Sequence, residues 1–264
     1  MEKLALVTFF SYFCMVKRRF LTFVVCGVII TVAVLVYHRA PITIGKWSMQ
    51  TAYIWLLDCW YGKAPNSAAS ILLVDDDGGN GIYQLKKICD ETGFKATFAV
   101  IPARLSMREI DSLRKWQKEG FGICLHGYNH DDWKRWTSQN VIEDINKCES
   151  LLSKRGINMK ELSRYVVTPY GRNTIAIRNA IQAKRYKMIT GASLVNPDST
   201  RFQLGRVFIT KATEIKNVEE LLKKAKAENA FIILGTHSSN IEEFAPEKIK
   251  ATLTKAKEIG FEQL

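Results

Sequence analysis

Three short segments of the chain carry most of the side chains that could bind a metal or move a proton. Residues 75–77 are three consecutive aspartates before two glycines, His126 and His130 stand four residues apart, and His237 lies near the C-terminus. Crowded carboxylates repel one another unless a cation neutralises them, and two imidazoles at this spacing could chelate one ion. A turn that caps the next helix would explain one aspartate but poorly explains three. These residue types therefore indicate a metal site.

The elements that must position these residues follow a β–α pattern, in which short apolar runs alternate with longer amphipathic stretches. Three of the amphipathic stretches close on glycine 93, 120 or 156, the residue type preferred just after a helix. We expect strands at residues 71–75, 96–101, 122–125, 165–168, 187–190, 207–210 and 231–234. Seven strands in this order predict a parallel sheet, either a barrel or an open wound sheet.

The chemically interesting residues all follow predicted strands, and both arrangements place functional groups at the carboxyl ends of strands. The aspartates follow the first strand, His126 and His130 the third, and His237 the last; the chain has only four histidines. Alone, His126 would be unremarkable and His237 would be expected to cap a helix. Because they occur together with the aspartates, convergence on one cleft is the better interpretation.

In this order, the segments resemble the motifs of the polysaccharide deacetylases, carbohydrate esterase family 4, also called the NodB-homology family. The resemblance covers roughly residues 70–264. An Asp-Asp-Gly motif matches Asp76 to Gly78, and a pair of histidines separated by three residues matches His126 and His130. The resemblance implies an α/β fold, a deformed (β/α)7 barrel of the NodB-homology type.

The resemblance also implies a role for each matching residue. Asp77, His126 and His130 would bind a divalent metal, commonly Zn²⁺, with positions left open for water and substrate. Asp76 would be the general base that takes a proton from the attacking water, and His237 the acid that protonates the amine leaving group.

The segment Pro169-Tyr170-Gly171 matches the family's third motif, although on its own it would be an ordinary turn. The resemblance implies that this segment contacts the substrate and that the backbone N–H of Tyr170 donates to the oxyanion of the intermediate.

The chain departs from the family pattern in its supporting residues. The family usually has an arginine that pairs with the base where this chain has Val167, and Arg164, Arg172 or Arg206 could substitute. Asp198 could orient His237, although a surface turn fits that position equally well.

The residue before the Asp pair is also unusual, since Asp75 stands where the family usually has an aromatic residue. Strand alternation would put Asp75 and Asp77 on one face and Asp76 on the other. We assign the role of base to Asp76 because of its position in the sequence relative to Gly78.

The N-terminal region predicts a membrane anchor. Residues 20–37 are 18 residues without a charge, close to the length that a helix needs to cross a bilayer. The basic residues 17–19 outweigh Arg39 and Lys46, which favours a cytoplasmic N-terminus and a catalytic domain on the outer side, periplasmic or extracellular. A cleaved signal peptide is the alternative. The predicted segments are a cytoplasmic stretch at residues 1–19, a transmembrane helix at 20–37, a connector at 38–69 and the catalytic domain at 70–264.

Composition narrows the choice of partner. The net charge of +12 and the pI near 9.4 suit an anionic surface, but no nucleic-acid-binding motif accompanies them, and we expect no nucleic-acid partner. A disulfide could form among Cys59, Cys89, Cys124 and Cys148 outside the cytoplasm.

The expected function is metal-dependent removal of N-acetyl or other N-acyl groups from amino sugars of a cell-envelope polysaccharide. Two alternatives stay open. One is a deformylase or deacetylase of a polyprenyl-linked sugar, and the other is a catalytically silent glycan-binding envelope protein.

Overall fold

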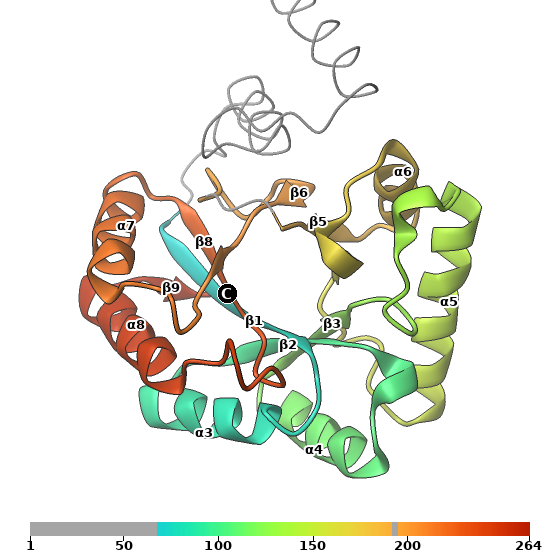
Figure 1. The fold of residues 1–264 in the computed structure, drawn as a ribbon, viewed down its shortest axis with the longest axis horizontal. Coiled ribbons are helices and arrows are strands. Elements are labelled where there is room, and N and C mark those ends of the chain that lie inside the picture. Colours follow the sequence, from blue (N-terminus) through green and yellow to red (C-terminus); the bar gives the residue numbers. More distant parts are fainter. Residues whose placement is uncertain (1–67, 192–194) are drawn as a thin grey trace, which may run out of the picture. The chain divides into compact units, whose positions relative to one another are not determined.

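The described part of the chain is a parallel sheet that curls around a central axis, with helices on its outer side (Figure 1). The computed structural model describes residues 68–191 and 195–264, which belong to one compact unit. The strands follow the order β6-β5-β4-β3-β2-β1-β8-β7, and β9 pairs with β1. This order results from successive β–α units, because each helix returns the chain along the outer face before the next strand begins.

All seven predicted strands are confirmed, with ends that differ by at most two residues. The strands are β1 (Ser70–Asp77), β2 (Ala96–Val100), β3 (Gly122–Leu125), β4 (Tyr165–Val167), β5 (Lys187–Ile189), β6 (Gln203–Leu204), β7 (Val207–Phe208), β8 (Phe231–Thr236) and β9 (Glu262–Gln263). The α-helices are α3 (Ile82–Thr92), α4 (Met107–Lys118), α5 (Ser138–Lys154), α6 (Ile175–Ala183), α7 (Ile215–Ala227) and α8 (Pro246–Ile259). Strands β6 and β9 are two residues long, too short to give a recognisable pattern.

One interrupted segment, residues 203–208, joins the two ends of the sheet. Its first part, β6, pairs with β5, and its second part, β7, pairs with β8. Between the two parts, the backbone N–H of Gly205 donates to the Asn196 side chain, and the Asn196 amide donates to the Gly205 carbonyl, at 2.8 and 2.9 Å. The strands therefore form a deformed parallel barrel, which fits the expected fold class.

The strand residues alternate between two apolar layers. One layer packs against the helices and contains Leu73, Phe98 and Leu234, together with apolar residues of every α-helix. The other consists of strand residues alone and fills the interior; its members are Leu72, Val74, Ala99, Cys124, Val167, Ile189, Leu204, Phe231 and Ile233. Because both faces of the longer strands β1, β2 and β8 are buried, these strands contain continuous apolar runs, as in other parallel sheets with covered faces.

Helix ends lie where the sequence pattern indicated. The residues that follow α3, α4 and α5 include glycines 93, 120 and 156, with φ of 78°, 91° and 80°. Ser106 and Thr137 begin α4 and α5, each with a capping box that satisfies the first free backbone N–H groups. These local signals set the helix lengths and hence the loops in which the polar residues of the site lie.

Two further predictions concern the N-terminal segment and the cysteines. The predicted transmembrane helix, residues 20–37, lies outside the described residues, and within those residues no helix is both long and apolar enough to span a bilayer. Cys89, Cys124 and Cys148 are buried and free, so the disulfide considered among them does not form; Cys59 lies outside the described residues.

The barrel closure can be tested by Asn196→Ala. The substitution leaves the N–H and carbonyl of Gly205 without these buried partners, and each such loss costs roughly 1–3 kcal/mol, so we expect the free energy of unfolding to fall by about 2–6 kcal/mol. Chemical denaturation of the full chain measures this change. Asn217→Ala, at an exposed amide that bonds Glu214, is the control and should change stability little. Equal stability of both variants would contradict this role for Asn196.

Candidate metal and acid–base site

Strand β1 runs through all three aspartates and changes direction at the last one. Asp76 continues the inward series of Leu72 and Val74, whereas Asp75 lies on the side that faces the helices. Asp77 has a left-handed backbone conformation, with φ of 76°, so it leaves the strand alternation. The prediction from strand alternation, that Asp75 and Asp77 lie on one face, is therefore wrong. Asp76 and Asp77 both point into the site.

Asp77, His126 and His130 form a cluster that could hold a metal ion. One ligand atom from each residue lies within 4.8 Å of the others, with Asp77 Oδ1 at 3.4 Å from Nε2 of His126 and 3.7 Å from Nε2 of His130. His126 is 1% exposed, and its Nδ1 lies 2.9 Å from the carbonyl oxygen of Val167. Because a carbonyl only accepts, the proton is on Nδ1, and the lone pair of Nε2 faces the cluster.

Two further features of the cluster fit a metal ion. Among the described residues, the buried Nε2 atom of His126 has no hydrogen-bond partner. Burial lowers the pKa of His130, which favours the neutral imidazole that a metal requires. Burial would raise the pKa of Asp77, but the two neighbouring histidines outweigh it, so the pKa is lowered and the carboxylate is favoured.

The two histidines lie in a tight loop rather than on a helix. Gly127 and His130 have positive φ, at 76° and 62°, and Asp144 of α5 accepts a hydrogen bond of 2.8 Å from the backbone N–H of Tyr128. Burial raises the pKa of Asp144. The spacing of the histidines thus results from a loop conformation that a buried carboxyl group stabilises.

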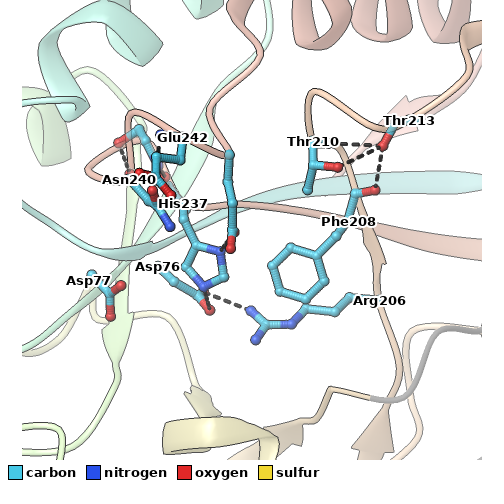
Figure 2. A network of polar contacts seen from close by, with 12 residues as sticks. Asp76, Asp77, Arg206, Phe208, Thr210, Thr213, His237, Asn240 and Glu242 are labelled. Carbon is cyan, nitrogen blue, oxygen red and sulfur yellow. Dashed lines mark hydrogen bonds and ion pairs between the residues drawn. The ribbon is translucent and has the colours of Figure 1, made fainter.

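Asp76 is buried between an arginine and a histidine (Figure 2). Nη1 of Arg206 donates to Oδ1 at 2.7 Å, and Nε2 of His237 lies 3.5 Å from Oδ2. Burial alone would raise the pKa of the Asp76 carboxyl, but Arg206, His126 and His237 together hold it well below its usual range. Asp76 is therefore an ionised carboxylate in the interior of the protein.

The sequence left open which of three arginines lies beside the Asp76 carboxylate, and in the structure it is Arg206. It is 3% exposed and comes from the interruption between β6 and β7, whereas Val167, at the family's arginine position, packs in the apolar interior. Arg172 instead pairs with Asp132 near the surface, at 2.8 and 2.7 Å. Arg164 lies over the ring of Tyr186. Of the three candidate arginines, Arg206 is therefore the one that contacts Asp76, and Arg172, considered as a possible support of the site, pairs elsewhere.

His237 is held by Glu243, a residue that the sequence did not single out. Nδ1 of His237 lies 3.0 Å from Oε2 of Glu243, and the ring of Phe208 stacks on the imidazole with centroids 5.1 Å apart. The contact with the Asp76 carboxylate raises the pKa of His237 more than burial lowers it, which favours the imidazolium. Asp198, proposed for this role, accepts bonds from the backbone N–H and hydroxyl of Thr200 in a turn.

Asp75 lies behind the acid–base pair. Its carboxylate accepts hydrogen bonds from the backbone N–H and the hydroxyl of Ser238, at 2.7 and 2.6 Å. Burial raises the pKa of Asp75 to about 8, although both bonds to Ser238 lower it. Neither Ser238 nor this contact was predicted.

The third-motif segment forms a short turn, Pro169–Gly171, after β4. Tyr170 has φ of 55° and is 59% exposed, and its ring lies 4.5 Å from that of His130. Pro169 is buried, and the N–H of Gly171 bonds the Thr168 carbonyl. The segment therefore lies at the edge of the metal cluster, where a substrate could reach it.

Beside His237 the surface has a cavity of about 440 Å³, within the size range of small-ligand sites. Its lining residues are Phe208, Thr210, Lys211, Ala212, His237, Glu242 and Glu243. The loops after β7 and β8 thus leave room next to the acid–base pair.

Comparison with known proteins identifies the domain. The sequence profile of the polysaccharide deacetylase family matches residues 63–189. The chitin deacetylase of Colletotrichum lindemuthianum has the same fold, with a TM-score of 0.56 and 17% identity over 75% of this chain and 86% of that chain. The chain carries a polysaccharide deacetylase domain.

Other proteins share the fold of this polysaccharide deacetylase domain. A family 4 acetyl xylan esterase from Clostridium thermocellum, solved with a cobalt ion, has a TM-score of 0.54 and 14% identity over 74% of this chain and 86% of its own. A protein described as a family pseudoenzyme, from Bacillus anthracis, has a TM-score of 0.53 and 16% identity over 76% of this chain and 64% of its own.

A curated relative, an uncharacterized protein of Methanocaldococcus jannaschii, is 28% identical over 141 residues. The match covers 48% of this chain and 55% of the relative, so the chain spans about half the length of that protein.

The metal cluster can be tested by His126→Ala. The variant removes one of three ligands, so we expect the full chain to lose most of its bound divalent metal after dialysis, as measured by elemental analysis. His237→Ala is the matched control, because it removes an imidazole from the same site but outside the cluster, and it should keep its metal. Unchanged metal content in His126→Ala would exclude His126 as a ligand.

Proposed function

We propose that the domain is a metal-dependent hydrolase that removes acyl groups from N-acylated amino sugars. One observation carries the proposal: the buried carboxylate of Asp76 lies between Arg206 and His237, next to the cluster of Asp77, His126 and His130. A carboxylate base, a protonated imidazole and three metal ligands are the groups that hydrolysis of an amide requires. The family match and the name of the chitin deacetylase neighbour support an N-acetylated glycan as substrate.

Asp77, His126 and His130 are the residues that would hold the ion. Two imidazoles and one carboxylate are a donor set typical of Zn²⁺ in hydrolases, and three protein ligands leave a position for water. When bound, a divalent metal there supplies a lowered pKa for water and polarises the acyl carbonyl.

The chain's own residues then move the protons. Asp76, ionised by its contact with Arg206, accepts a proton from water as the water oxygen adds to the acyl carbon. His237, with both nitrogens facing carboxylates, gives its Nε2 proton to the amine nitrogen as the C–N bond breaks. The products are a carboxylic acid and a free amino sugar. The exposed turn at Tyr170 supports the role proposed for its backbone N–H as a donor to the oxyanion.

We further propose that residues 20–37 anchor the chain in a membrane, with the N-terminus in the cytoplasm and the domain on the outer side. The support is the uncharged run of 18 residues after a basic cluster. A tethered domain also suits a polyprenyl-linked amino sugar, which is the second candidate substrate. The cavity beside His237 is large enough for one sugar unit.

The proposal is tested by acetate release from chito-oligosaccharides and N-acetylated peptidoglycan, with the full chain, with added Zn²⁺ and with chelator. Release that requires the metal supports the deacetylase. Release only from a polyprenyl-linked N-acyl sugar would favour the second candidate. Bound metal without turnover of any N-acyl sugar would indicate a silent glycan-binding protein.

Asp76→Asn should keep the metal but lose turnover by a factor of about 100 or more, because a general base contributes roughly 10²–10⁴-fold. Metal content and the initial rate on chito-oligosaccharides are measured on the same preparation. Asp132→Asn, which changes a surface carboxylate paired with Arg172, is the matched control. Full activity of Asp76→Asn would show that another aspartate is the base.

Arg206→Gln should move the acidic limb of the pH–rate profile to higher pH. Arg206 favours the ionised form of Asp76, so its loss raises the pKa of Asp76 and leaves more of the base protonated at low pH. An opposite charge at this distance is worth about 1–3 pKa units, so we expect a displacement of about one pH unit or more. Arg172→Gln, which removes a surface ion pair, should leave the profile unchanged. If the wild type, Arg206→Gln and Arg172→Gln have the same pH–rate profile, Arg206 does not control the ionisation of Asp76.

A further inference from the structure

Strands β1 and β8 carry two polar pairs that lie back to back at their carboxyl ends. The strands pair up to Asp75 opposite Thr236, and the next residues, Asp76 and His237, are the proposed base and acid. In β8, Phe231 and Ile233 face the interior, so alternation places His237 on the same side and Ser238 on the opposite side. The contact of Asp75 with Ser238 is therefore formed on the helix-facing side, directly behind Asp76 and His237.

The Asp75 side chain continues the hydrogen bonding between β1 and β8 beyond the last paired residues of the two strands. After Thr236, the backbone of β8 no longer pairs with β1, but the Asp75 side chain accepts both the N–H and the hydroxyl of Ser238. Asp75 is fully buried and Ser238 is 5% exposed, so water does not compete for these bonds. Both bonds are short, at 2.7 and 2.6 Å.

We propose that Asp75 is a positioning residue for His237, which it holds against Asp76 by fixing the neighbouring Ser238. The inference rests on the proposed function, in which His237 protonates the leaving amine. The backbone N–H that Asp75 accepts belongs to the peptide group between His237 and Ser238, so a displaced Ser238 moves the imidazole as well. Glu243 and the Phe208 ring contact the His237 side chain, and the N–H of Asn240 donates to its backbone carbonyl at 3.0 Å.

The chemistry of the leaving group separates this role from general stability. When an amide is cleaved, the C–N bond breaks only as His237 donates its proton to nitrogen, whereas 4-nitrophenyl acetate releases a stable phenolate without any proton. Both reactions need the metal and the base to add water to the acyl carbon. A misplaced acid thus slows the amide and spares the activated ester, while a distorted site slows both.

Four variants of the full chain form the test, with chelator-sensitive rates on chitopentaose and on 4-nitrophenyl acetate. Ser238→Ala removes one of the two bonds, and Asp75→Leu removes both. Because a displacement of about 1 Å can cost roughly 100-fold, we expect the amide rate to fall about 10-fold in Ser238→Ala and about 100-fold in Asp75→Leu. The ester rate and the metal content should stay close to those of the wild type.

Two variants serve as controls. Asp75→Asn keeps an acceptor for the N–H of Ser238 and offers a donor to its hydroxyl, so it should retain most of the amide rate. Thr236→Val changes the adjacent buried residue of the same strand, whose hydroxyl has no hydrogen-bond partner among the described residues, and should be neutral. Equal losses on both substrates, or full amide activity in Ser238→Ala and Asp75→Leu, would overturn the positioning role.

The imidazole NMR spectrum of the same proteins gives a readout without turnover, since the chain has only four histidines and His237→Gln identifies one of them. A shifted His237 signal in Ser238→Ala, but not in Thr236→Val, supports the proposal. If the wild type cleaves no amide, the proposed function fails, and an unchanged His237 signal in Ser238→Ala would then overturn the positioning role separately.

Discussion

The ion pair between Asp76 and Arg206 is the interaction on which the site depends. A carboxylate that is 1% exposed can stay ionised only if a positive charge lies close by, and Nη1 of Arg206 is 2.7 Å away. Arg206 in turn lies at the interruption of segment 203–208, which joins the two ends of the sheet, so the closure of the barrel and the charge of the proposed base have a common origin. Loss of either partner would leave the other charge buried without compensation.

Around this pair, other residues of the barrel hold the polar groups of the site in place. Glu243 contacts His237 from the loop after β8, Asp144 holds the histidine loop from α5, and the Val167 carbonyl orients His126 from β4. Parallel strands make this arrangement natural, because their carboxyl ends all meet on one side of the barrel. The residues that would hold a metal and the residues that would move protons therefore come from the carboxyl ends of β1, β3 and β8 and share one space.

Much of the architecture could be predicted from the sequence, because buried parallel strands and glycine-terminated helices leave strong local patterns. Asp76, Asp77, His126, His130 and His237 were predicted from residue type and strand position, and the structure brings them together. Their partners were not predictable with equal certainty. Arg206 and Glu243 lie in loops without periodicity, and only the fold reveals which of several arginines or carboxylates reaches the site. The left-handed backbone of Asp77 had no signal beyond the glycines that follow it.

The three buried thiols have a consequence for how the chain matures. Burial raises the pKa of Cys89 to about 12 and holds those of Cys124 and Cys148 well above the usual range of a thiol, so in the folded protein none of them is a thiolate that an oxidant could attack. The same thiols are accessible while the chain is extended. In an oxidising compartment, burial of the core must therefore outpace thiol oxidation, and a chain that folds too slowly would be trapped by mispaired cysteines. The interior of the barrel thus protects these cysteines, but only after folding is complete.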